Sequence, residues 1–328
     1  MQESKPLFLP IGAIKLEPPE WLIEGILERK TLCGIVGASY SGKSLIAIDM
    51  ALSLASGISF YGCEVKVGGV LYIAGEGNRG FMSRVTAWCE GHGGVEVENL
   101  PLFLSQQVVR LHEKLDIYSI VSEIERIQNV SLIIIDTLAS TFGGYDENKT
   151  ADMNSFISNC ALLRDLGPAV MIVHHTGHNK ERARGNSAFY ASLDTEMRVK
   201  EINKDIELSC TKMKDASQFD SITFLKIPCE LEGNNSSVYL EKVEAKKKKN
   251  RLIDIEKLAI KSLEQGTNSN VPQASINLSD WRNHFYAGHI GDNSDTKKKA
   301  FARVRHSLVS KGILSVHNDI YTLRDSET

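Results

Sequence analysis

The clearest signal of the fold class is Gly37-Ala38-Ser39-Tyr40-Ser41-Gly42-Lys43-Ser44, which matches the pattern GxxxxGK followed by Ser or Thr. Its glycines let backbone N–H groups wrap around phosphate oxygens, where a side chain would obstruct the approach. Lys43 would place its charge on the β- and γ-phosphates, and the Ser44 hydroxyl can ligate Mg²⁺. An apolar run at 31–36 precedes the stretch and a helical pattern at 45–56 follows it. The eight residues therefore predict a site for ATP with Mg²⁺ at the N-terminus of a helix.

The residues around this loop alternate between short apolar runs and longer helical patterns. Buried strands are expected at 31–36, 70–74, 132–136 and 169–174, and helices at 44–56, 117–128 and 150–166. This alternation predicts an α/β fold with a mostly parallel central sheet covered by helices. Four further short strands are expected between residues 194 and 243, where they would extend one edge of the sheet as hairpins.

Several of the expected strands end in polar side chains. Asp136 follows four aliphatic residues, Glu76 lies between two glycines, and His174 and His175 end the strand that begins at residue 169. The carboxyl ends of parallel strands meet at one edge of a sheet, where ligands bind. Asp136 would hold Mg²⁺ through water, and Glu76 would act as the base that polarises the attacking water. Of the two histidines, His175 would report hydrolysis to the loop that follows, and the other would belong to the core.

The loop after His175 contains three basic residues, Lys180, Arg182 and Arg184. They would contact a nucleic-acid backbone or the nucleotide of a neighbouring subunit. The alternatives are plainer: the three residues would form a solvated loop, and Glu76 would be an exposed loop residue without a role.

The charge of the chain is distributed unevenly. The 328 residues carry a net charge of −3, but residues 246–328 hold 15 basic and 9 acidic residues, whereas residues 1–245 hold 23 and 32. A basic end of this kind favours contact with an anionic partner. The alternative is that small domains often differ by several charges without binding any such partner.

The composition argues against several classes of protein. No apolar run approaches the ~18 residues of a membrane span, and the first residues lack the basic and apolar pattern of a signal peptide. The six cysteines are dispersed without a CxxC pair, which argues against a structural zinc site or a disulfide framework. We therefore expect a cytoplasmic protein with no membrane contact.

The run Lys246-Lys247-Lys248-Lys249 divides the chain, because like charges repel and keep such a segment solvated. We expect a nucleotide-binding core at 1–243, a basic linker at 244–251 and a small domain at 252–328. The small domain shows helical patterns at 252–265, 278–287 and 295–312, followed by alternating residues around an Asn318-Asp319 turn. Three helices and a terminal hairpin favour a winged-helix domain.

The last helical pattern of this domain is basic. Phe301, Val304 and Leu308 share one face of it, while Lys298 and Arg305 lie on others. A groove or the phosphates of duplex DNA could meet these two basic residues. The alternative is a domain that docks a protein partner or a second copy, with a basic face that is only solvated.

Together these segments resemble the RecA-like hexameric ATPases, and most closely the RepA-type plasmid replicative helicases of superfamily 4. The resemblance rests on GASYSGKS at 37–44, AGEG at 74–77, LIIIDTL at 132–138, and VHHTG at 173–177 followed by RARGNSAFYASLD. It spans residues 18–230 and implies a RecA-like core in which Lys43, Ser44 and Asp136 bind phosphate and Mg²⁺. Glu76 would be the catalytic base, and His175 the sensor that couples the nucleotide to DNA.

Hexameric members of this family also insert basic residues from a neighbouring subunit, in a Lys-x-Arg pattern on a late strand. This chain has Thr211-Lys212-Met213-Lys214 at the similar place, so a Lys stands where the family often has Arg. A Lys is a point charge and cannot bridge two phosphate oxygens as Arg does. The residue that acts on the neighbour's nucleotide is therefore open between Lys212, Lys214, Arg182 and Arg184.

The resemblance implies a homo-oligomeric ring, expected to be a hexamer, that hydrolyses ATP and moves on single-stranded DNA during plasmid or phage replication. Loops at 141–154 and 176–187 would line its central channel. Two alternatives stay open: a DNA-binding regulator of replication or transcription whose assembly ATP switches, and a RecA-like ATPase of recombination or defence.

Overall fold

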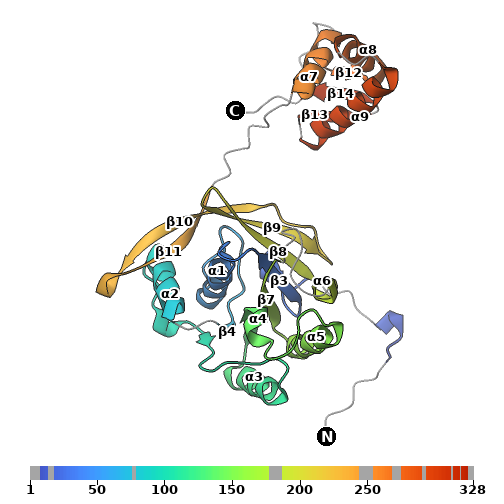
Figure 1. The fold of residues 1–328 in the computed structure, drawn as a ribbon. Coiled ribbons are helices and arrows are strands. Elements are labelled where there is room, and N and C mark those ends of the chain that lie inside the picture. The colour runs from blue at the N-terminus through green and yellow to red at the C-terminus, as the bar shows by residue number, and fades with distance from the viewer. Residues whose placement is uncertain are drawn as a thin grey trace. The chain divides into compact units, whose positions relative to one another are not determined.

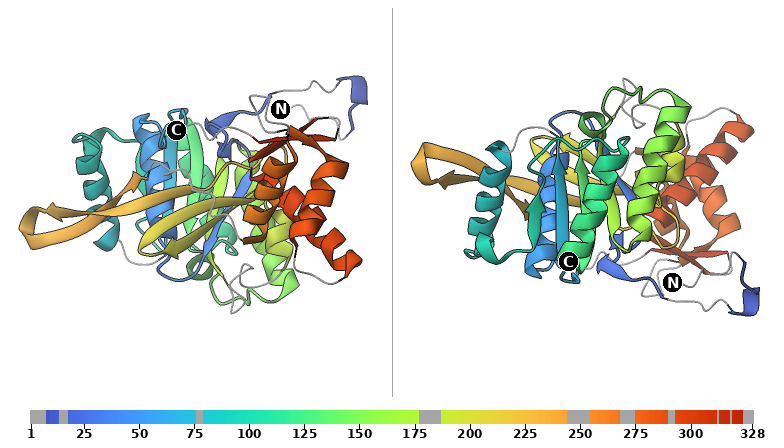
Figure 2. Two further views of the ribbon diagram at one scale, coloured as in Figure 1. Left: turned by 90° about the horizontal axis from the view of Figure 1, so that it is seen from above. Right: turned by 90° about the horizontal axis from the view of Figure 1, so that it is seen from below.

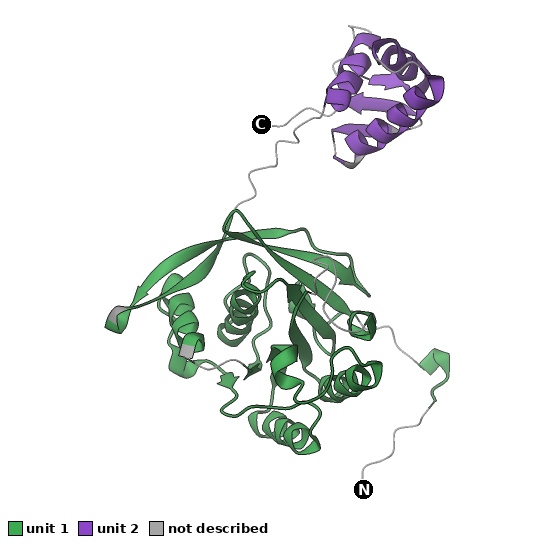
Figure 3. Cartoon of the chain, viewed as in Figure 1, with its two compact units in different colours: residues 1–244 green, residues 245–328 purple. Residues whose placement is uncertain are grey.

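A computed structural model of the chain describes residues 8–13, 18–75, 79–176, 187–243, 254–267, 275–289, 293–311, 313–317 and 319–323 (Figure 1). The chain forms two compact units, Met1–Glu244 and Ala245–Thr328, which are coloured separately in Figure 3. The expected linker at 244–251 lies outside the described residues. Each unit has a hydrophobic core of its own.

The described residues of the first unit form a nine-stranded sheet with the order β11-β10-β9-β8-β3-β7-β6-β4-β5 (Figure 1). Its part from β8 to β5 is parallel throughout, which confirms the expected α/β fold with a mostly parallel sheet. These strands are β3 (Leu32–Gly37), β4 (Gly69–Ala74), β5 (Leu102–Leu104), β6 (Val130–Asp136), β7 (Ala169–His175) and β8 (Thr195–Ile202).

The other end of the sheet is antiparallel, as the change of pattern after residue 194 predicts. Its strands are β9 (Asp205–Met213), β10 (Ile222–Leu231) and β11 (Asn235–Lys242). The β10–β11 hairpin is long, and its tip projects beyond α2 (Figure 2). A short hairpin of β1 (Trp21–Ile23) and β2 (Leu27–Glu28) precedes β3.

Helices cover both faces of the sheet, because the side chains of each strand alternate between two separate apolar clusters. Ile134 of β6 packs in the cluster that includes α1 and α2, whereas Ile133 and Ile135 pack with α3 and α5. The helices are α1 (Lys43–Ser56), α2 (Arg79–Gly91), α3 (Lys114–Ile127), α4 (Leu138–Thr141), α5 (Thr150–Asp165) and α6 (Ser187–Ser192). No helix in the described part of the chain has both the length and the apolar character needed to cross a membrane.

The sequence patterns do not predict α2, although Phe81, Val85 and Trp88 recur in it at helical spacing and are buried. They also miss β5, whose three residues are too short to show an alternation. α1 is unusual because every residue from 46 to 55 is buried, including Asp49. A helix buried on all sides has no solvated face.

The described residues of the second unit form three helices and a three-stranded antiparallel sheet with the order β12-β14-β13. Its elements are α7 (Asp254–Gly266), β12 (Ser275–Asn277), α8 (Leu278–Gly288), α9 (Ser294–Ser310), β13 (Leu314–His317) and β14 (Ile320–Leu323). Trp281, Phe285, Phe301 and Tyr321 form its aromatic core, in which the Trp281 and Phe301 ring centroids lie 4.9 Å apart. The winged-helix assignment stays a prediction.

Candidate active site

The loop at 37–44 joins β3 to α1. Gly42 closes it with a φ of 97°, and a Cβ at this position would collide with the Ile206 side chain. Tyr40 also has a positive φ, 63°, and its side chain is 95% exposed. Because α1 begins at Lys43, the loop and the first N–H groups of the helix together form a site that attracts anions.

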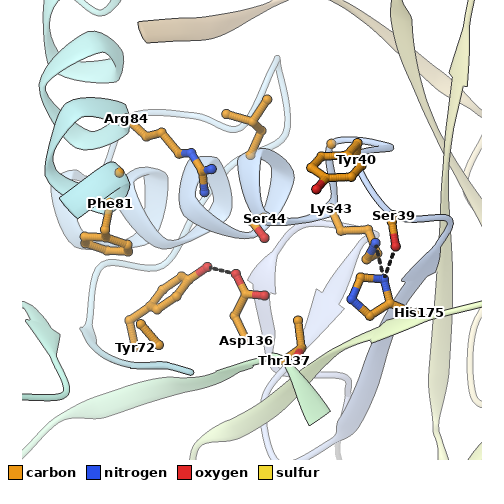
Figure 4. A pocket seen from close by; sticks show the side chains of 14 residues that line it. Ser39, Tyr40, Lys43, Ser44, Tyr72, Phe81, Arg84, Asp136, Thr137 and His175 are labelled. Atoms are coloured by element: carbon orange, nitrogen blue, oxygen red, sulfur yellow. Dashed lines mark hydrogen bonds between the residues drawn. The ribbon is translucent and has the colours of Figure 1, made fainter. Parts of the chain in front are cut away.

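A cavity of about 630 Å³ opens beside this loop (Figure 4). The loop, the N-terminus of α1, the helix α2 and the carboxyl ends of β4, β6 and β7 line it. Seven residues predicted from the sequence line this cavity: Ser39, Tyr40, Gly42, Lys43, Ser44, Asp136 and His175. Strand pairing brings them together, because Gly37 at the end of β3 lies opposite His175 at the end of β7.

Other residues of the predicted loop face elsewhere. Gly37, Ala38 and Ser41 line a separate cavity of about 310 Å³, next to Arg198 and other residues of β8. The Ser41 hydroxyl is buried and has no hydrogen-bond partner among the described residues. Ser39 borders both cavities.

Lys43 is the central cation of the larger cavity and is only 5% exposed. Its Nζ donates to the Ala38 carbonyl at 2.7 Å and lies 3.2 Å from Nδ1 of His175. The Ser39 hydroxyl lies 3.4 Å from the same ring nitrogen (Figure 4). An ammonium group has no lone pair, so His175 Nδ1 accepts in this contact and the ring proton is on Nε2. The predicted sensor therefore contacts the phosphate-binding loop directly.

Asp136 ends β6, and the Tyr72 hydroxyl donates to its Oδ2 at 2.6 Å (Figure 4). Tyr72 is 1% exposed; burial and then the neighbouring carboxylate raise its pKa well above 10, so it keeps its proton and stays a donor. The sequence patterns miss Tyr72. The signal was its position on β4, two residues before Ala74, because Ala74 lies opposite Asp136 in the sheet and Tyr72 shares that face.

The end of β4 is held against the start of α4. Gly75 N–H donates to the Asp136 carbonyl at 2.7 Å, and a Cβ on Gly75 would collide with the Ser140 hydroxyl. Ser140 in turn accepts from Thr137 N–H at 3.0 Å. Gly75 is thus fixed beside Asp136, and the next residue, Glu76, lies outside the described residues.

α2 contributes Phe81 and Arg84 to the cavity, and the sequence patterns predict neither. The Arg84 side chain points into the cavity from above Ser44 in Figure 4. In the described part of the chain it makes no ion pair. Arg84 directly precedes the buried Val85, so recognition of the α2 pattern would have placed it at the edge of the buried stripe.

A second buried carboxylate, Asp49, belongs to α1 and does not line the cavity. Asp49 accepts from the Tyr61 hydroxyl at 2.5 Å and from Trp88 Nε1 at 3.1 Å. Burial raises the pKa of Asp49 to about 7, although both hydrogen bonds oppose the shift. This carboxylate links α1 to α2, the helix that carries Arg84.

The two lysines expected to act on a neighbour's nucleotide do not line the cavity of their own chain. Lys212 Nζ donates to the carbonyls of Tyr190 at 2.9 Å and Ala191 at 3.2 Å, near the end of α6. Lys214 is 64% exposed, and its Nζ lies 3.6 Å from Asp194 Oδ1. Their action on another subunit stays a prediction.

The remaining predicted contacts with nucleic acid fall in two places. Lys180, Arg182 and Arg184 lie outside the described residues. In the second unit, Lys298 is exposed, whereas the Arg305 guanidinium lies 5.7 Å from the centroid of the buried Tyr321 ring. Arg305 is therefore used partly for packing.

The larger cavity fits a nucleoside triphosphate with Mg²⁺. A buried Lys at a helix N-terminus suits phosphate, and the Ser44 hydroxyl and the Asp136 carboxylate are oxygen ligands of the kind that Mg²⁺ prefers. Its volume lies within the range of small-molecule sites, which is about 300–1,000 Å³.

Comparison with known proteins agrees with this geometry. A family model described as "AAA domain" matches residues 6–181, which is more than half of the chain. No curated protein matches the chain. The matched range includes the loop at 37–44, Asp136 and His175. The chain therefore belongs to the AAA domain family and has the nucleotide-hydrolysing core of a P-loop ATPase.

Proposed function

We propose that this ATPase is a ring-forming DNA helicase or translocase that moves on single-stranded DNA, as in plasmid or phage replication. The observation that carries the proposal is the contact of His175 with Lys43 at 3.2 Å and with Ser39 at 3.4 Å. His175 ends β7, and the chain continues from there into the basic segment at 177–186. One residue thus connects the phosphate site to a segment suited to a nucleic-acid backbone.

Bound ATP would supply the γ-phosphoryl group, and Mg²⁺ would offset its charge. Lys43 would turn its ammonium group toward the phosphates, and its contact with His175 Nδ1 would then change. Ser44 and Asp136 would hold the metal, with Tyr72 fixing one oxygen of Asp136 while the other faces the cavity (Figure 4). Glu76 would polarise the attacking water, because it follows Gly75 at the end of β4.

Movement would be transmitted through the end of β7. Thr176 N–H donates to the Gly37 carbonyl at 3.1 Å, so the base of the 177–186 segment is hydrogen-bonded to the start of the phosphate loop. A change at the phosphates would therefore reach this segment and shift Lys180, Arg182 and Arg184 along the DNA backbone. Contacts of this kind are tolerant of sequence and sensitive to salt.

In a ring, basic residues of one subunit would complete the site of the next. Lys212, Lys214, Arg182 and Arg184 are the candidates. Arg84 offers a further positive charge from the same chain, so less positive charge would be needed from the neighbouring subunit to stabilise the phosphates.

The test is ATP hydrolysis with and without single-stranded DNA, together with unwinding of a forked duplex, for the wild type and Lys43→Ala. We expect stimulation by DNA, unwinding that requires Lys43, and six-membered rings in electron micrographs with a non-hydrolysable ATP analogue. In His175→Ala, the ratio of stimulated to basal hydrolysis should fall. Hydrolysis that DNA does not stimulate, with no unwinding, would overturn the proposal and favour an ATP-switched regulator.

A further inference from the structure

The basic residues in and next to the helix α9 of the second unit form two groups, one with partners inside the unit and one that faces solvent. Those on its inner sides are used within the unit: Lys297 Nζ donates to the Tyr286 carbonyl at 2.9 Å, and Lys311, just after α9, lies 2.7 Å from both oxygens of Glu256. Glu256 is 1% exposed, so this ion pair is buried on one side. Charges that face inward are thus compensated by specific partners.

The opposite side of α9, which we call the outer face, carries Lys298, Lys299, Ala302, Arg303 and His306, all of them exposed. Among the described residues, neither lysine of this face nor Arg303 makes an ion pair. These side chains therefore present positive charge to solvent, with one exposed carboxylate, Asp295, one turn before the two lysines.

Spacing places these residues on one surface. Lys299 and Arg303 are four residues apart, and a further three lead to His306, so they stack along one side of the helix. The stretch from Lys298 to His306 covers about 12 Å of helix axis at 1.5 Å per residue. Ala302, in the middle, keeps the surface low, so that the helix backbone can approach a ligand closely.

The side of α9 that faces the core is fixed by packing. Phe301, Val304 and Leu308 are at most 3% exposed and pack in the core of the unit. The outer face therefore belongs to a helix whose part from 301 to 308 is anchored in the core, which fixes its orientation within the unit.

The chemistry of the outer face favours a polyanion over a protein partner. Protein interfaces are enriched in aromatic residues, Met and Arg and depleted of Lys, and the outer face has two lysines and one Arg but no Phe, Tyr, Trp or Met. In the described part of the second unit, the large apolar side chains that are exposed are Val316 and Ile320, both on the β13–β14 hairpin. The outer face thus offers charge without an apolar anchor.

We propose that the outer face of α9 binds double-stranded DNA, through its phosphates and the major groove, and that it does so without nucleotide. An α-helix about 10–12 Å across fits the major groove, which is about 12 Å wide. This site lies on the second unit, and its binding of duplex DNA does not require the helicase activity proposed above. Of the residues expected from the sequence, this proposal keeps Lys298 and adds Lys299 and Arg303, while the Arg305 guanidinium lies 5.7 Å from the Tyr321 ring centroid.

The test uses the full chain and a labelled 20-base-pair duplex of arbitrary sequence, with binding followed by fluorescence anisotropy over a series of salt concentrations. One variant combines Lys298→Ala, Lys299→Ala and Arg303→Ala. The matched control combines Lys257→Ala, Lys261→Ala and Arg282→Ala, which removes the same charges from exposed positions of α7 and α8.

We expect the outer-face variant to lose at least tenfold in duplex affinity at about 100 mM salt, and its slope of log affinity against log salt to shrink by about 3. The control should lose less than threefold, and Lys43→Ala should bind the duplex like the wild type. Thermal unfolding and DNA-free ATP hydrolysis of both triple variants should match the wild type.

Equal losses in the two triple variants would show an effect of net charge alone and overturn the site. Absence of duplex binding by the wild type at low salt would overturn it too and leave the face to a protein partner. Loss of unwinding with duplex binding intact would count only against the helicase proposal, so the two failures are distinguishable.

Discussion

Lys43 and Lys299 carry the same charge in opposite surroundings. Lys43 is 5% exposed, and its ammonium contacts a carbonyl and the ring of His175. Lys299 is exposed, and among the described residues it has no ion pair. The electrostatic interactions of a charge are strong where water is excluded and are screened where water and salt are present.

The comparison explains how one chain can hold two kinds of anion site. The nucleotide cavity depends on a few charges fixed by strand pairing, so each of them should matter greatly. The outer face of α9 depends on the sum of several solvated charges, so each should matter little by itself. Substitutions in the two units can test how far this contrast extends.

The first prediction separates the two units. Phe301→Ala removes a ring that packs 4.9 Å from Trp281 and 5.1 Å from Phe285, and should destabilise the second unit by about 3–5 kcal/mol. Urea unfolding measures this loss, while ATP hydrolysis by the first unit should be unchanged. Val316→Ala, a truncation of a 45%-exposed side chain, is the control. A parallel loss of ATPase activity would show that the units depend on each other.

The second prediction concerns the buried cation. Lys43→Ala should lower the rate of ATP hydrolysis by about 100-fold or more, because a fixed charge that faces the phosphates in a partly water-excluded site contributes several kcal/mol. Phosphate release measures the rate, and circular dichroism checks the fold. If more than a tenth of the activity remained, the cavity would not be the site of hydrolysis.

The third prediction is a pH dependence that arises from Asp49. Its pKa rises from 3.8 to about 7 on folding, so between these values the native state holds a proton that the unfolded state has lost. Stability should therefore fall as pH rises from about 4 to 7 and level off above that, by about 2 kcal/mol between pH 5 and 7.5.

Asp49→Asn removes the titration and should remove this fall. Urea unfolding of the wild type and the variant at pH 5 and 7.5 measures the difference. Equal pH profiles for the two proteins would show that Asp49 keeps an ordinary pKa in the folded chain.

The fourth prediction concerns the hydroxyl that fixes Asp136. Tyr72→Phe deletes the donor at 2.6 Å from Oδ2 and should raise the Mg²⁺ concentration for half-maximal ATPase activity by about tenfold, as loss of a partner behind a metal ligand typically does. Tyr118→Phe makes the same change on a side chain that is 65% exposed and serves as the control. An unchanged Mg²⁺ requirement would mean that Asp136 does not need Tyr72.

A site residue could be predicted from the sequence where its pattern lies within a few neighbouring residues, and not where its role depends on residues far apart in the chain. The loop at 37–44, Asp136 and His175 could be recognised because a few neighbouring residues carry each pattern. Tyr72 and Arg84 could not, because their roles arise from the register of β4 with β6 and from a helix whose apolar positions are separated by polar residues. The basic residues of α9 show the same limit, since composition alone does not say that Arg305 packs on Tyr321 while Lys299 and Arg303 face solvent.

Three properties follow from the order of the amino acids alone: the phosphate loop, the α/β alternation and the division of charge between a large acidic part and a small basic one. These properties reside in short stretches or in sums over the chain. Which side chains meet in the cavity, and which charges of α9 are exposed, depends on the folded structure. Such neighbours are set by sheet order and core packing, which join residues far apart in the chain, and burial then determines how strongly each charge acts.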